Sequence, residues 1–100
     1  MSKQNNYLDD LPDWSNDLAI KLGLEEGFEL TPEHFEILTI ARTFYADYGF
    51  SPSMRPLCKV VTAGLGVDKG RSIYLNRLFP GSPAKIAAKL AGLPKPKNCI

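Results

Sequence analysis

The chain has 100 residues, of which 44% are hydrophobic and 23% are charged, and its formal net charge is +1. This length allows one domain with a modest core, and this composition is that of a globular protein, which excludes intrinsic disorder as the default state. No apolar run approaches the roughly 20 residues that cross a bilayer, and residues 1–10 lack the basic-then-apolar order of a secretion signal, so we expect a cytoplasmic protein that does not bind membranes.

The N-terminal part of the sequence predicts a short strand-like piece and a first helix. Residues 6–9 favour a short extended segment, but nothing else in the chain alternates in polarity and pairs with it. Residues 15–22 are predicted to form a helix, and Trp14 supplies a large apolar anchor at its start.

A second helix is predicted over residues 35–48. The Thr-Pro-Glu sequence at 31–33 places a capping hydroxyl before a proline at the first helical position, where the missing N–H costs nothing. Apolar side chains then recur at helical spacing, and Gly49 ends the run. The only histidine, His34, lies in the first turn, where we expect a surface or capping residue.

Three shorter helices follow in the second half of the chain. The first covers residues 52–64 and begins with a Ser-Pro pair; its Pro56 is tolerable only in the first helical turn. Cys58 lies on the apolar face of this helix and is predicted to pack in the core. The next two helices are expected at about 70–79 and at 84–91. Together these elements predict an all-α fold.

The last eight residues, 93–100, differ from the rest because Pro94 and Pro96 remove backbone donors and fix φ. Such a segment favours an extended, polyproline-like shape of about 3.1 Å per residue, roughly 25 Å in all. We therefore divide the chain into a helical domain of residues 1–92 and a semi-rigid C-terminal arm with Cys99 near its tip.

Cys99 has the features of a reactive thiol. The positive charges of Lys95 and Lys97 favour its thiolate, whereas the terminal carboxylate of Ile100 opposes it. An exposed thiol is a redox liability without structural use in a tail. We do not expect His34 to act as its base, so a Cys/His enzyme is not favoured. A thiol on an arm suits the carriage of a group between partners; the alternative is an incidental tail cysteine.

The two halves of the chain carry opposite charges. Residues 1–50 contain three basic and ten acidic residues, and residues 51–100 contain nine basic residues and one acidic residue. Basic clusters of this kind often meet phosphates or acidic partners. The alternative explanation is that the two oppositely charged halves attract each other within the fold. The two cysteines have no metal-type spacing, and we expect neither a metal nor a cofactor.

Motifs along nearly the whole chain resemble the DsrC/TusE family. The most specific is the closing Ala-Gly-Leu-Pro-Lys-Pro followed by a penultimate cysteine and an apolar residue, within 91–100. Further matches are single residues or short motifs of the helices and their connections: Trp14, 25–27, 30–34, Tyr45, 48–49, Pro52, Arg55, Leu57, Lys59, 69–70, Ser72, 74–75, 78–80 and 83–85.

The resemblance implies a small helical bundle with a helix-turn-helix-like core, a short or vestigial N-terminal strand and a mobile C-terminal arm. It also implies that the penultimate cysteine, here Cys99, carries a persulfide. DsrC-like members have a second cysteine eleven positions upstream, which allows a trisulfide. This position is Ala88 here, so the resemblance favours the TusE-like branch.

In that branch the resemblance implies a relay that takes sulfur from a TusBCD complex and passes it to the tRNA 2-thiouridylase MnmA, which thiolates the wobble uridine. Basic residues are candidates for steering an acidic partner or tRNA phosphates, and for each of them an ordinary solvated charge is the alternative. These candidates are Arg55, which is expected beside the root of the arm, Lys59, Arg71, Lys85, Lys95 and Lys97.

Two other functions stay open. The helices at 35–48, 52–64 and 70–79 have the short connections of a helix-turn-helix, and the basic second half fits a nucleic-acid-binding module. However, no helix gathers Arg, Asn and Gln on one face to read bases. The second alternative is a protein associated with dissimilatory sulfite reductase, which Ala88 weakens.

Overall fold

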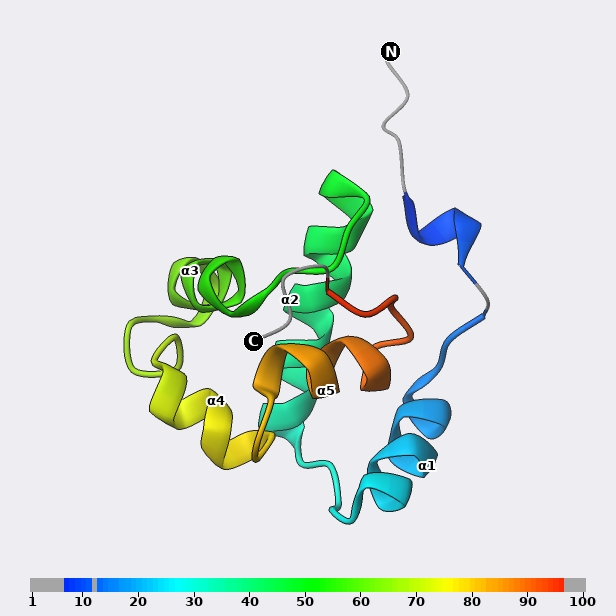
Figure 1. The fold of residues 1–100 in the computed structure, drawn as a ribbon, viewed down its shortest axis with the longest axis horizontal. Coiled ribbons are helices and arrows are strands. Elements are labelled where there is room, and N and C mark those ends of the chain that lie inside the picture. The colour runs from blue at the N-terminus through cyan, green and yellow to red at the C-terminus, as the bar shows by residue number, and fades with distance from the viewer. Residues whose placement is uncertain (1–6, 12, 97–100) are drawn as a thin grey trace.

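The computed structural model describes residues 7–11 and 13–96, apart from the side chain of Asp10, and this part of the chain consists of helices and their connections (Figure 1). A 3₁₀ helix, η1, is followed by five α-helices. Their bounds are Tyr7–Asp10 for η1, Asn16–Glu26 for α1, Pro32–Tyr48 for α2, Met54–Leu65 for α3, Ser72–Leu78 for α4 and Pro83–Leu90 for α5. The predicted all-α fold is confirmed.

The predicted strand at residues 6–9 is wrong in its described part. Tyr7–Asp10 form η1, and the N–H of Leu11 donates to the carbonyl of Leu8 at 3.0 Å. A strand needs a neighbouring strand for its backbone hydrogen bonds, and the described segments include none, so a local turn takes its place. Asn6 lies outside the described residues.

Helix α1 continues to Glu26, beyond its predicted end at Leu22. Gly23 lies inside the helix and is buried, and a Cβ at this position would lie only 3.1 Å from Leu30 Cγ. Close packing thus explains a glycine that, in sequence alone, looks like a helix end. The helix ends at Gly27 instead, where φ is 98°.

The remaining helices lie close to their predicted ranges. Helix α3 begins at Met54, two residues later than predicted, with Ser53 as its N-cap. Pro56 is therefore the third helical residue and lies in the first turn, where a proline leaves the hydrogen bonds of the helix intact. Helix α4 lies within 70–79, and α5 is shifted by one residue from 84–91.

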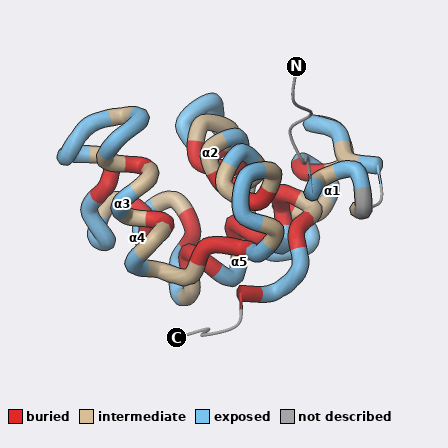
Figure 2. Tube along the Cα trace, turned by 90° about the horizontal axis from the view of Figure 1, so that it is seen from above, coloured by how far each residue is buried: buried red, intermediate tan, exposed pale blue. Residues whose placement is uncertain are grey.

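Helix α2 lies at the centre of the bundle, and the other helices pack around it (Figure 1). It contacts η1, α3 and α5, and α5 in turn contacts α1, α3 and α4. Figure 2 shows the buried segments concentrated along α5 and the inner faces of its neighbours. The largest fully buried apolar side chains are Ile37, Leu38, Leu57, Val61, Leu75, Phe79 and Leu90. Among the described helices, none is long and apolar enough to cross a membrane.

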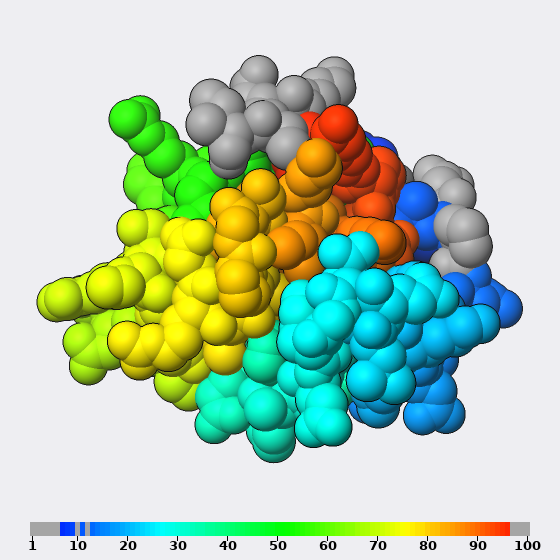
Figure 3. Space-filling view, turned by 60° about the horizontal axis from the view of Figure 1, so that its bottom comes forward, coloured from blue at the N-terminus to red at the C-terminus, as the bar shows by residue number. Residues whose placement is uncertain are grey.

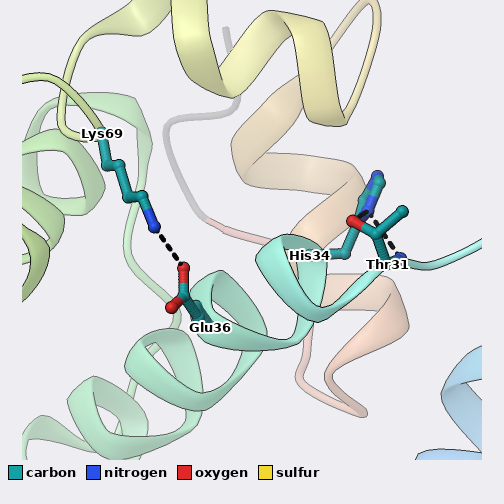
Figure 4. Close-up of polar contacts among 4 residues, drawn as sticks. All are labelled: Thr31, His34, Glu36 and Lys69. Carbon is teal, nitrogen blue, oxygen red and sulfur yellow. Dashed lines mark hydrogen bonds and ion pairs between the residues drawn. The ribbon is translucent and has the colours of Figure 1, made fainter.

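Two ion pairs in the described part of the chain join its acidic half to its basic half. Lys69 Nζ lies 2.8 Å from Glu36 Oε1 (Figure 4), and Lys89 Nζ lies 2.5 Å from Glu26 Oε2. In each pair the hydrogen bond to the carboxylate raises the pKa of the lysine. Attraction between the halves therefore operates at these two points, although such solvent-accessible pairs add little to the free energy of unfolding.

His34 is 7% exposed and holds α2 against α4. Its Nδ1 accepts the backbone N–H of Thr31 at 3.0 Å and lies 2.8 Å from the Thr31 hydroxyl (Figure 4), which completes the N-terminal cap of α2. Its Nε2 lies 2.7 Å from the carbonyl oxygen of Leu78. Because a carbonyl only accepts, Nε2 carries the proton. Of the two expected roles, surface or capping residue, the capping role is confirmed. The ring is buried, because Phe28 and Phe79 lie against it.

Replacing His34 with alanine should lower the free energy of unfolding by about 2–4 kcal/mol, because a buried side chain is lost and two backbone groups lose their partner. Urea denaturation followed by circular dichroism measures this change. Thr39→Ala, at an exposed position of the same helix, is the control and should change it by less than about 0.5 kcal/mol. Equal losses in the two variants would contradict the role of the imidazole.

Candidate functional site

The C-terminal end of α5 sets the direction of the predicted arm. Gly92 has φ 74°, its N–H donates to the carbonyl of Lys89 at 3.2 Å, and the N–H of Leu93 donates to the carbonyl of Ala88 at 2.8 Å. These two bonds form a Schellman turn, which ends a helix and satisfies its last carbonyls. The turn requires a left-handed residue, and glycine adopts that conformation at low cost.

Two side chains from distant parts of the chain satisfy the next two carbonyls. Trp14 Nε1 donates to the carbonyl of Leu90 at 2.8 Å, and Arg42 Nη1 donates to the carbonyl of Ala91 at 2.6 Å. The Arg42 guanidinium also lies 4.4 Å from the centre of the Trp14 ring, which is a cation–π contact. Desolvation lowers the pKa of Arg42, although a guanidinium keeps its charge. The segment before α1 and helix α2 thereby both fix the end of α5.

Residues 92–96, which begin in this turn, are called the arm root below, and they pack against the bundle. Leu93 is 7% exposed and belongs to the core cluster. The Ser51 hydroxyl donates to the carbonyl of Pro94, and Pro96 is buried. The chain is therefore held against the domain as far as Pro96.

The predicted site residue Cys99 lies outside the described residues, as does Lys97. Covalent geometry still limits where the thiol can be, because a chain spans at most about 3.6 Å per residue and the Cα of Cys99 is thus within about 11 Å of that of Pro96. The division of the chain into a domain of 1–92 and a mobile arm of 93–100 stays a prediction.

A cleft of about 600 Å³ opens beside the arm root. Figure 3 shows this side of the surface, where the cyan end of α1, the orange α5 and the connection before α5 meet. Its lining includes Glu26 of α1, Lys85, Ile86 and Lys89 of α5, and Leu93 and Lys95 of the arm root. Two of the predicted basic residues, Lys85 and Lys95, are thus brought together.

The other described basic candidates do not line this cleft. Arg55 and Lys59 are exposed on successive turns of α3, and Arg71 is the exposed N-cap residue of α4. Ser51, whose hydroxyl binds the arm root, precedes Arg55 by four residues. This contact places the connection before α3 against the arm root, while the position of Arg55 beside it and the partner-binding roles of all three stay predictions.

Cys58 is half-buried, so the prediction of a core position is only partly right. It packs against the core from α3, which lies at the margin of the bundle (Figure 1). Part of its side chain is open to solvent. Burial raises the pKa of this thiol. A raised pKa keeps the thiol protonated at neutral pH, which is the opposite of what a sulfur nucleophile needs.

These features define a class of protein: a small helical domain that holds its C-terminal segment at a fixed point, with a cysteine three residues further on. A family model described as "DsrC like protein" matches residues 1–100, and the chain belongs to this family.

Curated relatives and solved structures agree with this membership. Sulfurtransferase TusE of Escherichia coli (strain K12) and of Salmonella choleraesuis (strain SC-B67) are each 47% identical over 94 residues, which cover 94% of this chain and 86% of theirs. DsrC of Allochromatium vinosum is 42% identical, with a TM-score of 0.81 over 98% of this chain and 88% of that one. The oxidized gamma-subunit of the dissimilatory sulfite reductase (DsrC) from Archaeoglobus fulgidus is 30% identical, with a TM-score of 0.74 over 100% and 90% of the two chains. The expected family and a sulfurtransferase function are confirmed.

Gly92→Ala should destabilise the fold more than Gly27→Ala, by at least about 1 kcal/mol. Both glycines have positive φ, 74° and 98°, but a Cβ at position 92 would lie 2.7 Å from Trp14 Cδ1, whereas one at position 27 has no atom within 4 Å. The control, Gly27→Ala, should therefore lose only the strain energy of a left-handed alanine, about 1–2 kcal/mol. Urea denaturation compares the two variants, and equal losses would show that Trp14 does not pack against this turn.

In a Cys99→Ser variant, the remaining Cys58 should react with iodoacetamide more slowly than a free cysteine at about pH 7.5, because its raised pKa lowers the thiolate fraction. The rate should still be rising above about pH 8.5, the ordinary pKa of a cysteine. Intact-protein mass at a series of pH values gives the rate, and the same variant in urea provides the unfolded reference. A rate that levels off at lower pH than in urea would contradict the raised pKa.

Proposed function

We propose that this chain carries sulfur as a persulfide on Cys99 and relays it, in the cytoplasm, from a TusBCD-type donor complex to an MnmA-type tRNA thiolase for 2-thiolation of the wobble uridine. The arm root is the observation that carries this proposal. The chain is held as far as Pro96, three residues before the thiol, so a short tether can enter a partner's pocket while the domain stays outside. The identity of 47% to sulfurtransferases TusE supports the same role.

The transfer needs no external oxidant. The Cys99 thiol gives its proton to solvent, and its thiolate attacks the outer sulfur of a persulfide on the donor. The S–S bond of the donor breaks, and the donor cysteine leaves as a thiolate with the bonding electron pair. In the second step an acceptor thiolate attacks the same outer sulfur, now on Cys99, and releases the Cys99 thiolate. Each step exchanges one S–S bond for another.

A second candidate is the role that the Archaeoglobus fulgidus relative has in its name, a subunit of dissimilatory sulfite reductase. The similarity between the fold of this chain and that of the Archaeoglobus fulgidus relative favours this candidate. Position 88, however, is an alanine that is 1% exposed in the core, and without a thiol there no trisulfide can form with Cys99. We therefore place this role second. The nucleic-acid-binding alternative gains no support from relatives that are sulfurtransferases.

Incubation with a persulfide-loaded TusBCD-type complex should add one sulfur atom to the wild type and to Cys58→Ser, and none to Cys99→Ser. The reason is that the terminal thiol is the nucleophile, whereas the thiol of α3 is half-buried and protonated. Intact-protein mass detects the added sulfur, and a reductant should remove it. Sulfur bound to Cys99→Ser, or absent from the wild type with a verified donor, would refute the proposal.

A further inference from the structure

We propose that the cleft beside the arm root is the docking site for an acidic segment of the sulfur donor. This inference rests on the proposed function, and it names the surface by which one of the two partners is recognised. The donor would thus be bound by residues that also hold the segment leading to the thiol.

The charge of the cleft favours an anionic partner. Lys89 is paired with Glu26 at 2.5 Å, but the described residues offer no carboxylate to Lys85 or Lys95. Two like charges that line one cleft repel each other, and an anionic group placed between them relieves this repulsion. The cleft is therefore electrostatically complementary to carboxylates.

The walls of the cleft favour a peptide over a phosphate backbone. Pro80, Ile86 and Leu93 line the same space as the lysines. Leu93 belongs to the core cluster, and Ile86 packs against it. A volume of about 600 Å³ accommodates a few side chains. Binding of a nucleic acid backbone depends on cations spread along phosphates, whereas apolar walls between two lysines fit an acidic residue next to an apolar one.

The positive charge also favours the donor over the acceptor. In the proposed relay the acceptor binds tRNA, so the surface around its active site must itself be positive. A cleft with two lysines that have no carboxylate partner among the described residues would be repelled by this protein surface. Attraction to the tRNA phosphates would instead appear as a defect of Lys85→Glu in delivery to the tRNA-bound acceptor. The donor handles no nucleic acid in this relay, and an acidic segment beside its persulfide is compatible with its task.

The position of the cleft couples docking to transfer. Leu93 and Lys95 line the cleft and belong to the arm root, which the Ser51 hydroxyl holds through Pro94. A donor segment at Lys95 is four residues from Cys99, or at most about 14 Å along the chain. Docking therefore raises the effective concentration of the donor persulfide at the thiol.

Lys85→Glu tests this site. Lys85 is exposed and is the third residue of α5, where the helix N-terminus favours a carboxylate, so the variant is expected to fold. Lys21→Glu is the matched control, since it reverses the same charge at an exposed position of α1 outside the cleft. Persulfide transfer from a loaded TusBCD-type complex is followed by intact-protein mass over a series of donor concentrations.

Lys85→Glu should raise the half-saturating donor concentration at least about tenfold and leave the maximal rate unchanged, because it adds repulsion to docking alone. Lys85→Gln, which only removes the charge, should act in the same direction and more weakly. The half-saturating donor concentration of the control should stay within about twofold of the wild-type value. Equal weakening by Lys85→Glu and Lys21→Glu, or no change in Lys85→Glu, would overturn the proposal.

The second half-reaction separates donor from acceptor. Wild type and Lys85→Glu, loaded at Cys99 with sodium polysulfide, should deliver sulfur to an MnmA-type enzyme with bound tRNA at the same rate. A defect of Lys85→Glu in this delivery, with normal loading from the donor, would place the acceptor or its tRNA in the cleft and overturn the proposal. Failure of the proposed function itself is distinct, because then the wild type would not load from the donor at all.

Discussion

The carbonyl groups at the C-terminal end of α5 need partners in a place that water does not reach, and much of the molecule is arranged around this constraint. Leu90 and Ala91 are fully buried, and a buried carbonyl without a hydrogen bond is costly. The partners of these two carbonyls come from Trp14 and Arg42, which are 76 and 49 residues away in sequence. The segment before α1, the central helix and the last helix thus converge on one turn.

This convergence holds the end of α5 and the start of the segment that leads to the proposed sulfur site. The Schellman turn alone would let the following residues swing, since it fixes only one end of them. Leu93 in the core and the Ser51 hydroxyl on Pro94 add two further restraints. The connection before α3 and the end of α5 therefore act together, and the cleft with Lys85 and Lys95 has a wall of fixed shape.

The helices could be predicted because their signals are local. Proline after a capping threonine at 31–32 and the glycines at 49 and 92 mark helix ends through backbone preferences that need no tertiary context. The closing motif likewise identified the family and Cys99 as the candidate site. The features that sequence analysis missed depend on contacts between residues that are distant in sequence.

Three examples show this limit. Gly23 looks like a helix end, but packing against Leu30 makes it an interior residue. His34 lies in the first turn of α2, where most polar residues are exposed, yet it is buried because its Nε2 bonds to the carbonyl of Leu78. Arg42 was not included in the predicted site. A cation within the apolar run of a helix does, however, indicate a buried hydrogen-bond acceptor, here the carbonyl of Ala91.

The arm root also limits how a relay through this thiol can proceed in time. With the chain held at Pro96, the Cα of Cys99 stays within about 11 Å of that residue, so every partner must bring its own sulfur to the same small region. In the proposed relay the donor and the acceptor must both reach this region, so we expect the carrier to leave the first before it gives its sulfur to the second. Exchange then follows a ping-pong scheme, in which no ternary complex forms. In such a scheme, very tight binding to either partner slows the relay as a whole, because dissociation becomes the step that every turnover must await.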